Sequence, residues 1–415
     1  MNGNEIFTQE PSDIICTCAP GISQFLAKEL RDLGFHAGHS TDTTVATEGT
    51  LADCMTLNLR LRTAHRVLYT LDKFSARYAD RLYDNLVDIP WERYIDPSGY
   101  FSIDKVVEND SIQNTNFASL KAKDAIVDRI RAKTGARPNT GNSRHSLCLF
   151  LHWVGADASV YIDTTGESLS FRGYRGFTSE APMRESLAAA IVLASGWEGK
   201  TPFVNPMCGC GTIAIEAAWI AQNRPPALYR DNFSFMHLAC YEPPMWTNLR
   251  ASAIKDFEAS KTSAPPVIAT DIDSRMIDAA RENAKLAEVE GLISFDTCDF
   301  MMTDCSGVAA QRQALHSNAA TPPKGAIIVN PPYGGRMGDP IRLRDIYAGL
   351  GVFFKRNRDA YNSFLFTGNP ELARDAGLSW DDSRTLFNGA IECEFIPNPD
   401  IAPEAENMFK RKHKI

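Results

Sequence analysis

Between residues 180 and 400, short apolar runs alternate with amphipathic stretches. Strand-like runs cover 202–205, 267–270, 293–296, 326–329, 363–366 and 392–396, and helical spacing covers 186–195, 212–221, 274–287 and 341–354. Strands that alternate with helices predict an α/β domain with a mostly parallel, doubly wound sheet. Asn388-Gly389 precedes the last run and is typical of a hairpin turn, so the final strand should be antiparallel to its neighbour.

The first 165 residues show a different pattern, with fewer and longer elements. Residues 13–18 predict a strand, and helices are expected from about Ile22 to Gly34 and over 51–68. A strand over 100–107, a helix over 118–133 with Leu120 facing inward, and a hairpin of 146–153 with 158–163 follow. We therefore predict an α+β region over 1–75, a second domain over 76–165, a linker and lid helix over 166–200, the α/β domain over 201–400 and a frayed basic tail over 401–415.

Composition narrows the class of protein. The chain has 415 residues, of which 44% are hydrophobic and 23% are charged, as in globular proteins. It has no apolar run of about 18 residues, and its N-terminus lacks the pattern of a secretory signal. Ten scattered cysteines, two pairs of which are separated by a single residue, do not match zinc spacing. We expect a cytoplasmic protein with reduced thiols, no metal and no membrane partner. The net charge of −8 argues against an indiscriminate nucleic-acid binder but permits a local basic face.

A glycine-bearing turn separates the first strand of the α/β domain from its helix. Ligands bind at such carboxyl ends of parallel strands, where glycine permits close approach and helix amides attract a carboxylate. S-adenosylmethionine carries a carboxylate, a ribose and an adenine, so this turn is a candidate donor pocket. The alternative is a glycine turn required only for packing. The candidate residues are Asn205, Pro206, Met207, Cys208, Gly209, Gly211 and Thr212.

Acidic positions after the next two strands favour the donor pocket. Asp271, followed by Ile272 and Asp273, is placed to accept both ribose hydroxyls, although Asp273 is equally suited to cap the next helix. Asp299 can accept from the adenine amino group and Phe300 can cover the ring; a solvated turn is the alternative for Asp299. Upstream, Arg184, Glu185 and Ser186 begin a helix expected over the same pocket, where Ser186 has either a pocket or a capping role.

The turn Asn330-Pro331-Pro332-Tyr333 follows the fourth strand and is a candidate acceptor pocket. An exocyclic amine on a base is a poor nucleophile because its lone pair is delocalised into the ring. The Asn330 side-chain oxygen and the Pro331 carbonyl can bind both amine hydrogens, and positioning then supplies much of the rate without a strong base. The prolines stiffen the turn and Tyr333 can stack on the base. An Asx-Pro turn with a packed tyrosine is the alternative.

With these motifs in place, the chain resembles the bacterial 23S rRNA guanine-N2 methyltransferases. In that family a ferredoxin-like region and a THUMP domain precede a Rossmann-like class I methyltransferase domain with a seven-stranded sheet whose last strand is antiparallel. The resemblance covers nearly the whole chain and implies S-adenosylmethionine as cofactor and ribosomal RNA, free or in a pre-ribosomal particle, as partner. The segments that carry it are Trp91-Glu-Arg-Tyr, Lys121-Ala-Lys-Asp-Ala-Ile-Val-Asp, Arg172-Gly-Tyr-Arg, Ala181-Pro-Met-Arg-Glu-Ser-Leu-Ala-Ala-Ala-Ile-Val and Asn330-Pro-Pro-Tyr-Gly.

Two positions depart from the family pattern. The family usually has Asp where this chain has Asn205, and Ser where it has Cys210. Asn205 can still bond the ammonium group of the donor, but without the ionic component, so we expect weaker donor binding. Some relatives carry a second methyltransferase domain at the C-terminus; none is expected here.

Basic residues cluster in the helix over 118–133 and its exit. The THUMP-like region should bind RNA by its backbone and shape, although a solvated helix face is the alternative for each residue. Arg172 and Arg175 lie at the predicted domain junction, on a path toward the pocket. The candidate RNA contacts are Lys121, Lys123, Arg129, Arg131, Lys133, Arg137, Arg172 and Arg175.

Four functions remain open from sequence. The leading one is methylation of a guanine N2 amine in 23S rRNA. The same turn suits N6 methylation of adenine in RNA or DNA, and N5 methylation of a protein glutamine, which the RNA-type region disfavours. The fourth is an RNA-binding assembly factor with a weak or vestigial methyl site, slightly favoured by Asn205 and disfavoured by the intact Asn330–Tyr333 turn.

Overall fold

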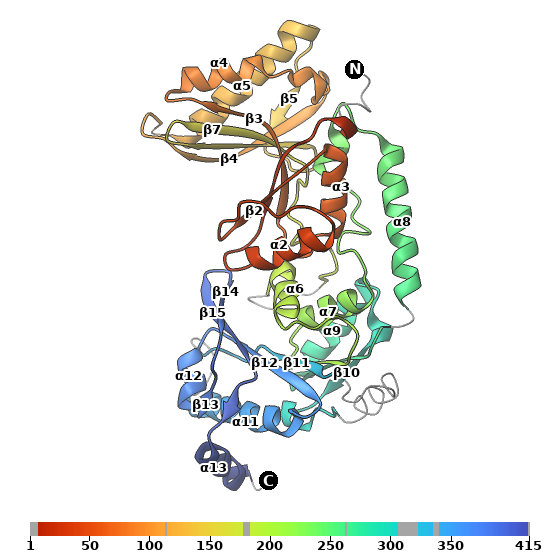
Figure 1. Ribbon diagram of the computed structural model, residues 1–415, viewed down its shortest axis with the longest axis vertical. Coiled ribbons are helices and arrows are strands. Elements are labelled where there is room, and N and C mark those ends of the chain that lie inside the picture. The colour runs from red at the N-terminus through yellow and green to blue at the C-terminus, as the bar shows by residue number, and fades with distance from the viewer. Residues whose placement is uncertain are drawn as a thin grey trace. The chain divides into compact units, whose positions relative to one another are not determined.

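A computed structural model describes residues 7–112, 114–176, 183–261, 264–305, 323–334 and 340–413. Two compact units make up the chain (Figure 1). The first unit comprises Met1–Ala19, Leu26–Phe171 and Pro225–Ile254, and the second comprises Pro20–Phe25, Arg172–Arg224 and Lys255–Ile415. Pro225–Ile254 thus lies with the first unit, although the sequence places it inside the α/β domain. Ala181 and Lys414, which belong to predicted segments, lie outside the described residues.

The first unit is built on one sheet of seven strands. The strand order is β2 (Thr44–Gly49), β1 (Ser12–Thr17), β3 (Arg66–Ser75), β7 (Asp157–Asp163), β6 (Leu147–Val154), β4 (Tyr100–Glu108) and β5 (Asn139–Gly141). The predicted hairpin of β6 with β7 is confirmed. Helices α3 (Leu51–Arg60), α4 (Ala79–Asp88), α5 (Thr115–Thr134) and most of α2 (Ser23–Asp32) belong to the first unit, and α4 lies beside α5 (Figure 1). The sequence did not predict β2, β3 or α4.

Two predictions for the first unit are wrong. The helix expected over 51–68 ends at Arg60, because the amides of Arg62 and Thr63 donate to the buried carboxylate of Glu29, at 2.8 and 3.0 Å, instead of to helical carbonyls. The chain then enters β3. Leu120, expected to face inward, is 51% exposed. The buried side of α5 is formed instead by Ala118, Ala122, Ala125, Ile126, Val127 and Ile130.

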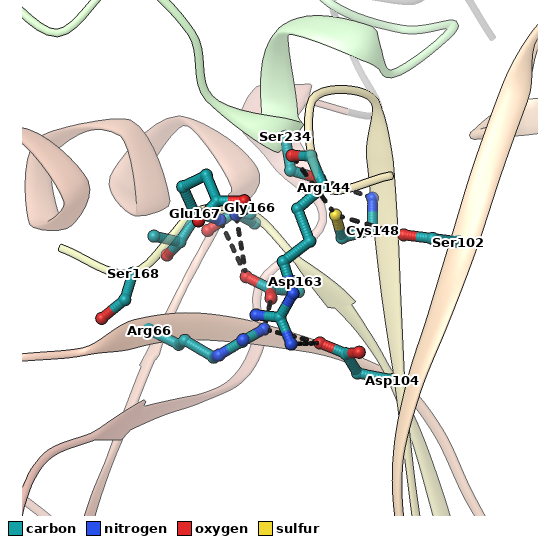
Figure 2. Close-up of polar contacts among 12 residues, drawn as sticks. Arg66, Ser102, Asp104, Arg144, Cys148, Asp163, Gly166, Glu167, Ser168 and Ser234 are labelled. Carbon is teal, nitrogen blue, oxygen red and sulfur yellow. Dashed lines mark hydrogen bonds and ion pairs between the residues drawn. The ribbon is translucent and has the colours of Figure 1, made fainter. Parts of the chain in front are cut away.

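A buried ion-pair cluster fixes the turn that follows β7. Figure 2 shows the guanidinium of Arg66 between Asp163 and Asp104, with Arg144 also paired to Asp104 at 2.6 Å. The Asp163 carboxylate also accepts from the amides of Thr165 and Gly166, at 3.0 and 3.2 Å. Burial raises the pKa of Asp163, although Arg66 opposes that shift. Because the two acids and the two arginines balance, the cluster orders the chain and forms no net basic surface.

The second unit contains the predicted doubly wound sheet. Its strand order is β10 (Ile293–Thr297), β9 (Val267–Asp271), β8 (Phe203–Pro206), β11 (Gly325–Val329), β12 (Tyr361–Thr367), β15 (Ile391–Pro397) and β14 (Arg384–Asn388). The first five strands are parallel, and β15 is antiparallel to both of its neighbours, as the Asn388-Gly389 turn predicts. Helices α6 (Glu185–Ala194), α7 (Thr212–Ala221), α9 (Ser274–Leu286) and α11 (Pro340–Asn357) agree closely with the expected ranges.

The expected frayed tail is instead a helix, α13 (Pro403–His413). Phe409 is only 8% exposed, and its ring lies against Gly349 of α11, where an added Cβ would come within 2.9 Å of it. Glu406 holds Lys355 of α11 and Lys410 of α13, each at 2.7 Å. The basic residues 410–413 therefore form the last turn of a helix that packs through Phe409, which the charge pattern alone did not indicate.

Candidate donor and acceptor site

The predicted donor loop joins β8 to α7. Backbone φ is positive at Met207, Gly209 and Gly211, with values of 57°, 54° and 83°. A Cβ on Gly211 would lie 3.0 Å from the Cβ of Ala280, so this glycine permits α7 and α9 to approach each other. A Cβ on Gly209 would meet none of the described residues within 4 Å. The two glycines therefore have different roles: Gly211 is required for packing, and Gly209 leaves open space beside the loop.

Asn205 provides a buried polar atom next to the loop. Its side chain is 1% exposed, and its Nδ2 donates to the Ile328 carbonyl at 2.9 Å. Its Oδ1 accepts no hydrogen bond from the described residues. A buried acceptor without a partner is costly, so this oxygen suits a cationic or N–H donor brought by a ligand.

Asp271 ends β9 and reaches the donor loop. Its Oδ2 accepts from the Gly209 amide at 2.9 Å, and its Oδ1 accepts from the Asp273 amide at 3.0 Å. Each carboxylate oxygen has a further lone pair, so Asp271 can accept ribose hydroxyls while it holds the loop. Asp273 takes the alternative role: it caps α9 through the Arg275 amide, and its hydrogen bond to the Arg275 side chain lowers its pKa.

Asp299 and Phe300, which the sequence assigns to the adenine, have a capping role and a core position in the structure. Asp299 is exposed, and its side chain accepts from the Met301 amide at 2.9 Å, capping a short 3-10 turn. Phe300 is 8% exposed and packs edge-on against Phe353 in the core, with ring centres 6.1 Å apart. By contrast, Ile272 is 65% exposed beside Asp271. In this conformation Ile272, and not Phe300, offers apolar surface at the ends of the strands.

The Asn330–Tyr333 turn is held at three points. The Tyr333 hydroxyl donates to Asn330 Oδ1 at 2.7 Å, Asn369 Nδ2 donates to the Tyr333 carbonyl at 2.8 Å, and the Tyr347 hydroxyl donates to the Pro332 carbonyl at 3.3 Å. The Tyr333 ring lies edge-on to Phe366, with centroids 6.5 Å apart. Burial raises the pKa of Tyr333 above its ordinary value, so the phenol keeps its proton and remains a donor to Asn330.

The structure brings the two predicted turns together. Strands β8 and β11 are parallel neighbours, with Phe203 opposite Ala326 and Val204 opposite Ile327. The donor loop and the Asn330–Tyr333 turn follow the carboxyl ends of these strands. The hydrogen bond from Asn205 to Ile328 also links the strands just before the two turns.

Arg172 and Arg175 occupy buried ion pairs in the second unit. Arg172 Nε lies 3.3 Å from Oε1 of Glu216, and these side chains are 1% and 0% exposed. Arg175 Nε lies 3.1 Å from Oε1 of Glu185 at the start of α6. Burial raises the pKa of Glu185, and Arg175 opposes that shift. Ser186 is fully buried in the first turn of α6, and the N-cap position is Arg184.

Sequence reasoning missed Glu185 and Glu216 as partners of these arginines. The sequence does contain an indication for Glu216, which is the one acidic residue in the apolar stretch that forms α7. A charged residue on such a helix requires a buried partner.

The basic residues of α5 divide into paired and exposed sets. Lys121 Nζ lies 3.1 Å from Asp80, Lys123 Nζ lies 3.2 Å from Asp124, and Arg129 makes a two-nitrogen contact with Glu92 at 2.9 and 3.1 Å. The exposed members are Arg131 and Lys133, together with Arg137, which follows the end of the helix. As an RNA contact, each of these residues remains a prediction.

No cluster of three or more His, Cys, Asp or Glu side chains suited to a metal ion occurs among the described residues. Within the same part of the chain, no helix is long and apolar enough to cross a membrane.

The topology of the second unit is that of the class I methyltransferases. The chain belongs to a family described as RMKL-like, methyltransferase domain, whose model matches residues 172–396. An RlmL ferredoxin-like domain matches residues 13–68 and a THUMP domain matches residues 76–163, which confirms the predicted family and fold class.

Two relatives are named ribosomal RNA large subunit methyltransferase K/L. The protein from Syntrophotalea carbinolica is 35% identical over 95% of this chain and 54% of its own length. The protein from Psychromonas ingrahamii is 36% identical over 93% and 50%, respectively. This chain thus spans about half the length of the curated relatives it matches.

Solved structures are similar over almost the whole chain. SMU.472, crystallised with SAH, is 28% identical with a TM-score of 0.81, over 94% of this chain and 98% of that chain. A protein from Listeria monocytogenes str. 4b F2365, described as a predicted N6-adenine-specific DNA methylase, is 27% identical with a TM-score of 0.81, over 94% and 96%.

Proposed function

We propose that this protein transfers a methyl group from S-adenosylmethionine to the N2 amine of a guanine in large-subunit ribosomal RNA. The observation that carries the proposal is the pair of turns at the ends of neighbouring strands β8 and β11. One has a buried acceptor without a partner in the described part of the chain, and the other has a fixed Asn-Pro-Pro-Tyr conformation. Relatives named for large-subunit ribosomal RNA supply the substrate class. A cytoplasmic location remains a prediction.

The residues of the donor loop fit S-adenosylmethionine. Asn205 Oδ1 suits its ammonium group, and the open space at Gly209 and the amides that begin α7 suit its carboxylate. Asp271 has lone pairs left for the ribose hydroxyls, and the exposed side chain of Ile272 offers apolar surface for the adenine. When bound, this cofactor supplies an electrophilic methyl group.

The acceptor turn prepares the amine for attack. Asn330 Oδ1 already accepts from the Tyr333 hydroxyl and keeps a second lone pair for one amine hydrogen. The Pro331 carbonyl accepts the other amine hydrogen. Together these two acceptors draw the nitrogen lone pair out of conjugation with the ring and orient it. No strong base is needed for this positioning role.

Adenine N6 methylation is the second candidate. It is favoured by the likeness to the Listeria monocytogenes protein, whose description specifies N6-adenine, and the turn geometry accepts either amine. The family match and the THUMP domain favour ribosomal RNA over DNA. The modified nucleoside decides between the two.

The test uses labelled S-adenosylmethionine with undermethylated large-subunit ribosomal RNA, with pre-ribosomal particles and with bulk DNA. We expect N2-methylguanosine from one of the RNA substrates, and no product from the Asn330→Ala variant. N6-methyladenosine in place of N2-methylguanosine would establish the second candidate. Donor binding without any methylated nucleoside would instead support the RNA-binding assembly factor.

A further inference from the structure

A short segment of the second unit, Arg172–Gly176, contacts the donor loop and the helices beside it. The Gly176 amide donates to Oδ1 of Asn283 at 3.0 Å, and Nδ2 of the same residue donates to the Cys210 carbonyl at 3.0 Å. Asn283 lies on α9 and is 1% exposed. One buried amide therefore ties this segment and the donor loop to the same helix.

Arg175 adds a second tie. Its Nη2 donates to the Met183 carbonyl and to Oγ1 of Thr212, the latter at 3.4 Å, while its Nε lies 3.1 Å from Glu185. Thr212 is the first residue of α7, directly after the donor loop. The Arg175 guanidinium therefore contacts the end of this loop from the segment Arg172–Gly176. Arg172, paired with Glu216 of α7, anchors the other end of the segment.

The donor loop has an unusual backbone conformation that depends on its neighbours. Three of its five residues have positive φ, and hydrogen bonds from the Cys208 amide to the Thr270 carbonyl and from the Gly209 amide to Asp271, each at 2.9 Å, hold it on the side of β9. A loop of this kind loses conformational entropy when it is ordered, and ligand binding is tighter if the fold has already ordered it.

We propose that Asn283 and Arg175 are positioning residues that hold the donor loop in its binding conformation. The inference rests on the proposed function and deepens it. It also gives Arg175 a role different from the RNA contact expected from sequence. Asn283 acts through the Cys210 carbonyl of the loop and Arg175 through the Thr212 hydroxyl at the end of the loop, so they should set the affinity for the donor and not the rate of methyl transfer once the donor is bound.

The test is Asn283→Asp, which keeps an acceptor for Gly176 but, when ionised, cannot donate to Cys210. We expect the dissociation constant for S-adenosylhomocysteine to rise about tenfold, since a buried carbonyl loses its partner. The KM for S-adenosylmethionine should rise by the same factor, while kcat at saturating donor stays within about twofold. Acidification should narrow the difference from wild type, because the introduced carboxyl group, once protonated, can again donate to Cys210.

The matched control is Asn58→Asp in the first unit. Asn58 is 0% exposed and its Nδ2 donates to the Cys54 carbonyl and to Thr164 Oγ1, each at 2.8 Å, so Asn58→Asp also breaks buried amide hydrogen bonds but should leave donor affinity unchanged. Unchanged affinity in Asn283→Asp, with normal binding by wild type, would overturn the inference alone. Wild type that binds no S-adenosylhomocysteine would overturn the proposed function as well.

If Asn283→Asp does not fold, Arg175→Lys takes its place. Lysine keeps the charge toward Glu185 but lacks the second nitrogen that reaches Met183 and Thr212. We expect the variant to bind S-adenosylhomocysteine about threefold more weakly. The bond to Thr212 that it loses contributes to donor affinity only indirectly, so the effect is smaller than that of a full hydrogen bond. Wild-type affinity in this variant would refute the role of Arg175.

Discussion

Replacing Asn205 by Asp tests how the donor is held. The Asn205 side chain is 1% exposed, its Nδ2 donates to Ile328 at 2.9 Å, and its Oδ1 has no partner among the described residues. An aspartate of the same shape offers an ionised acceptor to the ammonium of the donor but removes the N–H that Ile328 uses. The substitution therefore strengthens one contact and breaks another, and the two effects appear in different measurements.

The expected magnitudes follow from these contacts. A neutral hydrogen bond contributes about 1 kcal/mol and one to a charged group about 1.5–3 kcal/mol. Exchanging a neutral acceptor for an ionised one should therefore lower the dissociation constant about tenfold, which corresponds to about 1.4 kcal/mol of binding free energy. Without the donor, the carboxylate is buried and unpaired beside the Ile328 carbonyl, which should destabilise the fold by about 3 kcal/mol.

The assay compares two ligands by calorimetry near neutral pH. S-adenosylhomocysteine carries the ammonium group, whereas 5′-methylthioadenosine lacks the amino-acid part. We expect Asn205→Asp to bind the first about tenfold more tightly and the second unchanged, with a lower melting temperature in the absence of ligand. Asn205→Ala, which offers neither contact, should bind S-adenosylhomocysteine more weakly than wild type. An Asn205→Asp affinity no tighter than that of wild type would refute the assigned contact.

Three further predictions concern other parts of the chain. Tyr333→Phe should lower kcat about two- to tenfold, the worth of one hydrogen bond, whereas Tyr333→Ala should lose a further stacking contribution of about 1–3 kcal/mol in single-turnover methylation of RNA; equal rates for wild type and the Phe variant would exclude a role for the hydroxyl. Charge reversal at Lys121 and Lys123 should weaken RNA binding and flatten its salt dependence in filter binding, and unchanged binding would remove both residues from the interface. Phe409→Ala should lower the free energy of unfolding by about 3 kcal/mol, while Met408→Ala, 71% exposed on the same helix, should change it by less than about 0.5 kcal/mol in urea unfolding; similar values would contradict the packing of α13.

The parallel sheet was predictable because its signals are local. Each buried strand is an apolar run, and each following helix begins at a recognisable position, such as Gly211 before Thr212. The observed order of the parallel strands, β10-β9-β8-β11-β12, is the one that doubly wound sheets commonly have. The end of α3 was not predictable in this way, because the group that ends it is the carboxylate of Glu29, more than thirty residues earlier.

Long-range partners also decide the role of a charged side chain. Arg172 and Arg175 are indistinguishable from surface cations in the sequence, because Glu216 and Glu185 lie in apolar helices elsewhere. The same limit applies to Pro225–Ile254: Ser234 accepts from the Cys148 amide at 2.7 Å, and the amides of Ser234 and Phe235 donate to Thr165 and Thr164. No local sequence pattern predicts that Pro225–Ile254 belongs to the first unit.

Asn205 also joins the two halves of the candidate site. Its Nδ2 donates to the Ile328 carbonyl, two residues before Asn330, so the residue proposed to face the donor also links β8 to the strand that carries the proposed acceptor turn. An ionised aspartate, which the family resemblance leads us to expect at this position, cannot donate this bond. With Asn205, the chain thus offers no negative charge to the donor but has a hydrogen bond that links strands β8 and β11. For the same reason, Asn205 does not by itself indicate a vestigial site. Its amide makes a weaker electrostatic contact with the donor than a carboxylate would, but it stabilises the strand that carries the Asn330–Tyr333 turn.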